Sequence, residues 1–138
     1  MIKIKFFDAT AVVGHRGIKH EDAVWKTEDY IKELERCGIT GGLVYHGLSK
    51  VYDCMYGNML LVEELKKSDR LFGCWTVLPP HVKDFPDPDE FVSKFNKYNI
   101  AAVTIFPDSH NYSINRRTVD KLFKKLEEEN ILLIVKIG

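Results

Sequence analysis

Five apolar runs divide the chain at nearly regular intervals. Each run is rich in β-branched and aromatic residues and is mostly continuous rather than alternating, which is typical of parallel strands covered on both faces. Their recurrence about every 30 residues matches the size of a strand-helix unit. The runs predict strands over residues 2–13, 39–46, 71–78, 100–106 and 131–137.

Between these runs, apolar side chains follow the three- and four-residue spacing of amphipathic helices. The first helix is predicted to have Thr27 as its N-cap and Gly38 just beyond its end. The second and fourth helices are predicted around 59–65 and 119–126. The third starts at Asp87-Pro88-Asp89-Glu90, a capping-box-like sequence with proline at the first helical position.

Strands and helices therefore alternate, and the fold class is α/β with one domain over residues 1–138. Two architectures fit this order. A (β/α)8 barrel of the TIM type normally needs about 250 residues, so 138 residues would supply its first five strands and the barrel would be truncated. A five-stranded doubly wound sheet is the alternative, but it usually closes with a helix after its last strand. Because the sequence stops on the fifth strand, the partial barrel is favoured.

Charge and cysteine content limit the kinds of partner and the compartment that can be expected. Lys plus Arg and Asp plus Glu number 20 each, which predicts neither nucleic acid nor a membrane surface as a partner. The apolar runs are too short to span a membrane, and the N-terminus lacks the features of a signal peptide. The three cysteines form no C-x-x-C pair and are expected to be reduced packing residues of a cytoplasmic protein.

Histidines gather at one end of the predicted strands. In both architectures the carboxyl ends of the strands carry the ligand-binding face. All five histidines follow a strand: His15, His20, His46, His81 and His110. His15 and His46 stand nearest the strands and are the leading candidates for a general acid or base.

Other polar residues share that face. Arg16 suits a carboxylate or phosphate ligand, and Asn58 has a simpler alternative role as the N-cap of the second helix. Lys136 is unusual, because a cation inside "LLIVKIG" is costly to bury alone. It either points into a polar barrel mouth toward a carboxylate or lies exposed at the strand end. The full set is Asp8, Thr10, Arg16, Tyr45, Asp53, Asn58, Thr76, Thr104, Asp108, Asn111, Tyr112 and Lys136.

The segments "FFDATAVVG", "CGITGGLVYHGLSK", "DRLFGCWTVLPP", "IAAVTIFPDSHNYSIN" and "ILLIVKIG" resemble successive strands of amidohydrolase-related TIM-barrel hydrolases. The resemblance is to the aminocarboxymuconate-semialdehyde-decarboxylase-like branch, whose members are described as predicted metal-dependent hydrolases. It covers essentially the whole chain. P-loop, G-x-G-x-x-G, G-x-S-x-G and HExxH motifs are absent from the sequence.

The resemblance implies a divalent metal such as zinc, held by a His-x-His pair after an aspartate in the first strand. Here Asp8 matches the aspartate, but Thr10 and Val12 occupy the two ligand positions. A further metal-binding histidine near the end of the fifth strand corresponds to Lys136, and the catalytic aspartate of the eighth strand would lie beyond residue 138. The resemblance therefore implies a barrel mouth with a degenerate metal site.

Two functions remain open. The first is a hydrolase or lyase acting on a small polar or carboxylated substrate, with Asp8, His15 and His46 as catalytic residues. Its substrate-binding residues would be Arg16, Asn111, Tyr112 and Lys136. The alternative is a non-catalytic barrel relative that binds a ligand or a partner protein. With either function, a five-stranded barrel segment exposes two edges and an apolar face, so the chain is predicted to form a homo-oligomer.

Overall fold

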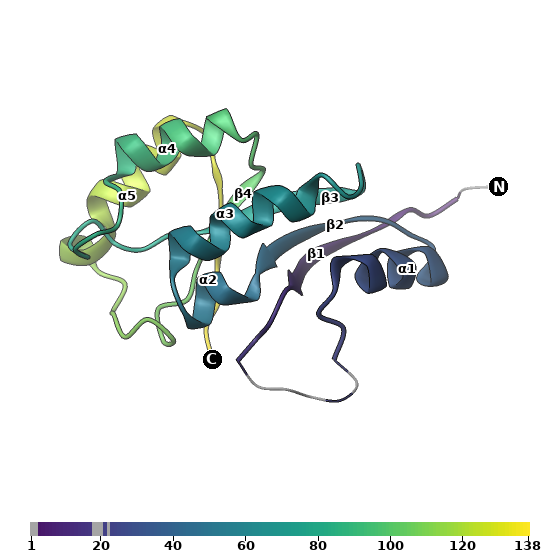
Figure 1. The fold of residues 1–138 in the computed structure, drawn as a ribbon. Helices are drawn as coiled ribbons and strands as arrows, with labels where there is room; N and C mark the ends of the chain where they lie inside the picture. Colours follow the sequence, from purple (N-terminus) through teal and green to yellow (C-terminus); the bar gives the residue numbers. More distant parts are fainter. Residues whose placement is uncertain (1–2, 18–20, 22) are drawn as a thin grey trace.

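The computed structural model describes residues 3–17, 21 and 23–138. Its five strands form one parallel sheet in the order β1-β2-β3-β4-β5 (Figure 1). The strands are β1 (Phe6–Val13), β2 (Ile39–His46), β3 (Leu71–Thr76), β4 (Ala102–Ile105) and β5 (Leu132–Val135). A doubly wound sheet reverses its strand order, whereas a β/α barrel adds each strand beside the last. The sequential order therefore confirms the partial barrel.

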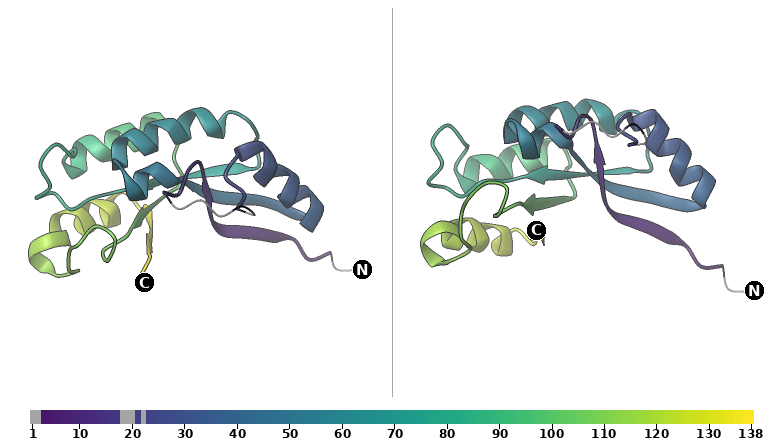
Figure 2. Two further views of the ribbon diagram at one scale, coloured as in Figure 1. Left: turned by 60° about the horizontal axis from the view of Figure 1, so that its bottom comes forward. Right: turned by 90° about the horizontal axis from the view of Figure 1, so that it is seen from below.

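The helices are α1 (Thr27–Cys37), α2 (Gly47–Val51), α3 (Cys54–Leu65), α4 (Pro88–Lys97) and α5 (Arg116–Glu128). Figure 2 shows the sheet curled, with the helices along its outer side and the C-terminus near its inner side. In the part of the chain that the structure describes, no helix is long and apolar enough to cross a membrane.

Two of the predicted helix ends are confirmed. Asp87 is the N-cap of α4, where its carboxylate accepts a hydrogen bond from the Glu90 amide at 3.0 Å. Gly38 ends α1 with φ of 67°, a left-handed conformation that glycine adopts without steric cost.

Two other helix predictions are wrong. Lys26 is the N-cap of α1, because Thr27 already lies inside the helix, where its hydroxyl donates to Glu64. Asn58 lies within α3, whose N-cap is Asp53. The carboxylate of Asp53 accepts from the Tyr56 amide at 2.8 Å, so the helix begins several residues earlier than predicted.

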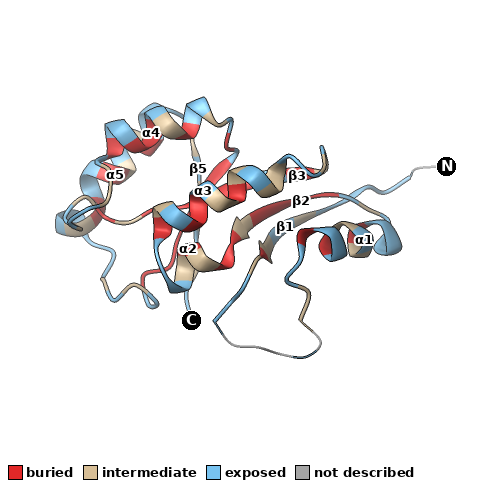
Figure 3. Cartoon of the chain, viewed as in Figure 1, coloured by how far each residue is buried: buried red, intermediate tan, exposed pale blue. Residues whose placement is uncertain are grey.

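The main core lies between the outer face of the sheet and the helices (Figure 3). Trp75 from β3 packs edge-on against Phe91 of α4, with ring centroids 5.7 Å apart, and both side chains are fully buried. The inner face holds a much smaller cluster, built on Leu43, Cys74 and Ala102. The curled sheet is therefore well packed outside and thinly filled inside.

Candidate active site at the strand ends

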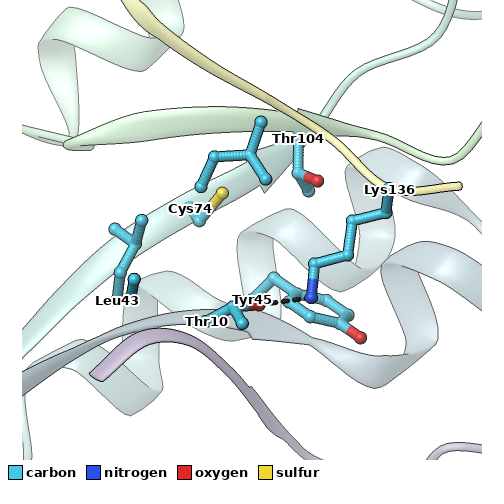
Figure 4. Close-up of a pocket in the computed structure, with 8 residues that line it drawn as sticks. Thr10, Leu43, Tyr45, Cys74, Thr104 and Lys136 are labelled. Atoms are coloured by element: carbon cyan, nitrogen blue, oxygen red, sulfur yellow. Dashed lines mark hydrogen bonds between the residues drawn. The ribbon is translucent and has the colours of Figure 1, made fainter.

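Lys136 lies just beyond β5 and reaches across the inner face to β1. Its ammonium group donates a hydrogen bond to the Thr10 hydroxyl and lies 5.4 Å from the centre of the Tyr45 ring (Figure 4). Among the described residues, no carboxylate forms an ion pair with it. Of the two orientations open from the sequence, Lys136 adopts the one into the mouth, but it meets a hydroxyl rather than a carboxylate.

The register of β1 explains why Thr10 is available to Lys136. Asp8 pairs with Gly42 and Ala11 pairs with Val44, so β1 has one residue more than β2 over this stretch. This irregularity is a β-bulge, which re-aims side chains at the edges of sheets. As a result both Ala9 and Thr10 line the space inside the sheet.

A buried hydroxyl in the same space lacks a partner. Thr104 in β4 is 1% exposed, and its Oγ1 has no hydrogen-bond partner within the described structure. It lies on the same side of the sheet as Lys136 (Figure 4). Orphaned buried hydroxyls are uncommon, because desolvating one without a hydrogen bond costs about 1–3 kcal/mol. The inner face therefore has one cation and, among the described residues, one hydroxyl without a partner around the same gap, which is too small to hold a water molecule.

Burial alters the acidity of two neighbouring groups. It raises the pKa of the Cys74 thiol to about 12, against a smaller lowering by Lys136. It also raises the pKa of the Tyr45 phenol, an effect that the charge of Arg16 opposes. Both groups are therefore neutral near pH 7, and Lys136 and Arg16 carry the positive charge at this mouth.

A hollow of about 410 Å³ opens beside this space at the edge of β1. Asp8, Arg16 and Lys136 all line it, so the structure brings together three of the residues that the sequence singled out. The Asp8 carboxylate accepts from the Tyr30 hydroxyl at 2.8 Å and from the Thr10 amide at 3.2 Å. These two bonds fix its orientation. Burial and the Asp8 carboxylate strongly raise the pKa of Tyr30.

His15 and His46 lie in a separate hollow of about 220 Å³, which shares no lining residue with the first. His46 is buried and is the N-cap of α2, because its Nδ1 accepts a hydrogen bond from the Leu48 amide at 3.2 Å. Burial lowers its pKa, so the neutral ring is favoured. The exposed ring of His15 stacks on Trp25 with centroids 4.3 Å apart. The structure therefore does not unite these histidines with Asp8, Arg16 and Lys136.

The remaining candidates follow β4 or lie elsewhere on the molecule. Asn111 is exposed with a positive φ of 57°, whereas the Tyr112 ring packs against the core and burial raises the pKa of its phenol to about 12. His110 Nε2 lies 2.9 Å from the Lys50 carbonyl oxygen. His81 is exposed, and His20 lies outside the described residues.

The sequence predicts Thr10, Tyr45 and Thr104 on the functional face but does not distinguish them as site residues. The available signal was strand parity: Leu43 and Tyr45 lie two residues apart and share the inner face with Cys74. Asn58 and Thr76 have a structural role instead. The Asn58 amide group donates to the Thr76 carbonyl and accepts from the Thr76 amide, both at 2.8 Å.

The residues present do not fit the divalent metal that the resemblance implies. Thr10 and Val12 offer one hydroxyl and no imidazole, and the Lys136 ammonium donates to that hydroxyl. A positive charge at this point would repel a divalent cation. The described residues include no group of three or more His, Cys, Asp or Glu side chains that could hold a metal ion.

The fold and the strand-end site together define the first half of a TIM-type β/α barrel with its polar face at the strand ends. The chain is similar in fold to the crystal structure of a probable 2-pyrone-4,6-dicarboxylic acid hydrolase from Acinetobacter baumannii with citric acid bound. The TM-score is 0.64 at 17% identity, and the match covers 96% of this chain and 49% of that one. The chain thus spans about half the length of that hydrolase. No protein-family model and no curated protein sequence matches it.

Proposed function

We propose that this chain is part of a hydrolase-like barrel that acts on a small carboxylated molecule bound at the strand ends. The observation that carries the proposal is Lys136, a half-buried cation at the mouth whose partner is a hydroxyl, with no carboxylate paired to it in the part of the chain that the structure describes. A charge-assisted hydrogen bond to a substrate carboxylate would satisfy it. The fold shared with a probable dicarboxylic acid hydrolase, whose structure holds citric acid, supports the same class of ligand.

The residues around the hollow have distinct proposed roles. Lys136 and Arg16 bind carboxylate groups, and the Arg16 guanidinium is positioned by its bond to the Val24 carbonyl at 3.2 Å. Asp8, held by Tyr30, accepts a proton from water as that water attacks an acyl carbon. The acyl carbon-oxygen bond then breaks, and Asp8 returns its proton to the leaving oxygen, which gives an alcohol or enol and a carboxylic acid that loses its own proton to water. No step is assigned to a metal, because Thr10 and Val12 do not supply ligands for one.

Non-catalytic ligand binding is the second candidate. It is favoured by His46, whose ring caps α2 and does not line the hollow beside Lys136. Asp8 supplies the carboxylate among the residues that line that hollow, and no histidine is among them. Binding and turnover measured on the same preparation separate the two candidates.

The test is calorimetric titration of the chain with citrate and with 2-pyrone-4,6-dicarboxylate. Lys136→Met is expected to weaken binding about tenfold or more, since a hydrogen bond to a charged group is worth about 1.5–3 kcal/mol. The matched control is Lys32→Met, which removes an exposed lysine of α1 and should bind normally. Equal affinity of wild type and Lys136→Met would refute the proposed site. Binding without ring opening of the pyrone would select the second candidate.

A further inference from the structure

The two outer strands of the sheet leave an unusually large apolar surface open. Phe6 of β1 is 60% exposed and Leu132 of β5 is 59% exposed. On the inner face Phe7 and Phe72 stack edge-on with centroids 5.7 Å apart, and each is about half exposed. In the described residues, neither β1 nor β5 pairs with a further strand along its outer edge. Such edges are sites of strand addition.

The total surface indicates how much of the molecule is left uncovered. A compact monomer of 16.0 kDa is expected to expose about 7,400 Å². This chain exposes 8923 Å², which is about 1,500 Å² more. Covering that excess on each of two copies would bury about 3,000 Å² in total, an area typical of obligate homodimers. The open surface is therefore large enough for a stable dimer.

Charges at the amino ends of the two edge strands, β1 and β5, are complementary. Lys3 and Lys5 directly precede β1, and Glu127 and Glu128 directly precede the turn into β5. All four side chains are exposed, and none forms an ion pair with another described residue. The two glutamates also lie at the carboxyl end of α5, where the helix dipole disfavours negative charge. A cation from outside the protomer would offset that cost.

Symmetry allows both edges to be used at once. A twofold axis parallel to the barrel axis keeps the sense in which every strand runs along that axis, so β5 of one copy can add in parallel to β1 of the other. The same rotation pairs β5 of each copy with β1 of the other at two identical junctions, which we call seams. It also places the two inner faces opposite each other. Because the amino ends of parallel strands share one edge, Glu127 and Glu128 then face the partner subunit's Lys3 and the partner subunit's Lys5.

We infer that this chain binds a second copy of itself through two β5-to-β1 seams, which close the open inner faces into one oval ring. The seams are apolar along Phe6 and Leu132, and they carry opposite charges at the amino ends of the two strands. This inference is independent of the proposed substrate, because it rests on the edges of the sheet and not on Lys136 or Asp8.

The first test is light scattering of the 138-residue chain over a concentration series. We expect a mass of about twice 16.0 kDa at high concentration, with reversible dissociation on dilution. A monomer at every concentration would overturn the inference, and further β/α units rather than a second copy would then be the candidates to cover the open face. A mass that keeps growing without a plateau would also overturn it, because two seams related by a twofold axis close the assembly.

A charge swap then tests the seam itself. The variant E127K/E128K and the variant K3E/K5E should each dimerise at least about tenfold more weakly than wild type, since like charges then meet at both seams. A one-to-one mixture of the two should regain the wild-type affinity, because opposite charges meet again at both seams of the mixed dimer. Variants that dimerise normally alone, or a mixture that stays dissociated, would refute this pairing.

The control is E63K/E90K, which makes the same change in net charge as E127K/E128K but on α3 and α4, away from both edges. It should dimerise like wild type. Circular dichroism and urea unfolding of every variant verify that the monomer is folded. Since all the substituted positions are exposed, the variants are expected to unfold at nearly the same urea concentration as wild type.

Discussion

On its outer face the sheet meets helices through fully buried side chains, whereas on its inner face large apolar side chains remain in water. Leu61 of α3 and Trp75 of β3 illustrate the outer face, and both are 0% exposed. Phe72, three residues before Trp75 on the same strand, is 47% exposed on the inner face. The two faces therefore have different roles: the outer face stabilises the fold, and the inner face carries the polar groups at its mouth.

The largest expected effect comes from two aromatic residues of β3 that point to opposite faces. Trp75→Ala should lower the free energy of unfolding by about 3–5 kcal/mol, because it opens a cavity in the densest part of the core. Phe72→Ala should cost less than about 1 kcal/mol, because its side chain is largely hydrated already. Urea unfolding, measured where the chain is monomeric, gives both values. Equal losses would show that the inner face contributes to stability as the outer one does.

The strands were predictable because each is a continuous apolar run. All five begin and end within a few residues of their predicted bounds. The same continuity hides which side chain faces inward, since Leu43 and Val44 look alike in sequence but pack on opposite faces of β2. Only the register of the sheet shows which side chains face inward. The bulge that turns Thr10 inward has no signature in the sequence of β1 alone.

The errors in the helices have physical causes of their own. α2 has five residues, too few to show helical periodicity, and it is stabilised by a cap from His46 rather than by an apolar stripe. Asn58 resembled an N-cap because asparagine favours that position. Its partner is the backbone of Thr76, 18 residues away, and such a contact cannot be deduced from local sequence. Lys136 could be recognised as a candidate site residue from the sequence, because a lone cation in an apolar run is costly to bury.

A smaller effect should distinguish two threonines that pair in register, Thr76 and Thr104. The Thr76 hydroxyl lies 2.6 Å from the Ser49 hydroxyl, so Thr76→Val should cost about 1 kcal/mol through the lost hydrogen bond. Thr104→Val removes a hydroxyl without a partner and should leave stability unchanged or slightly raised. Thermal unfolding of the two variants provides the comparison.

Ligand binding should distinguish neither threonine from wild type. Thr104 is buried and does not line the hollow beside Lys136, so Thr104→Val and Thr76→Val should both bind citrate as wild type does. A loss of stability in Thr104→Val comparable to that of Thr76→Val would mean that its hydroxyl has a partner in solution, and the contrast between the two would fail.

The smallest effect concerns pH and tests a residue on the outer face. The Nδ1 atom of His46 accepts a hydrogen bond at the start of α2 and must be unprotonated to do so. Burial and the nearby His15 lower the pKa of His46 below its ordinary value of 6.5, while Glu64 opposes them. The unfolded chain therefore binds a proton that the folded chain resists. Stability from this group is complete above pH 6.5 and is lost as the pH falls through the lower, folded value.

The matched control for this pH effect is His46→Asn, because asparagine can cap a helix but does not titrate in this range. Carboxylates contribute equally to both proteins and cancel in the difference. Urea unfolding at about pH 7.5 and about pH 5.5 should show a loss for wild type that exceeds the loss for His46→Asn, by up to the value of one helix cap, about 1 kcal/mol. If both proteins lose the same stability, the His46 ring is free to protonate in the folded state. The outer face would then be less rigid at the start of α2 than its burial implies.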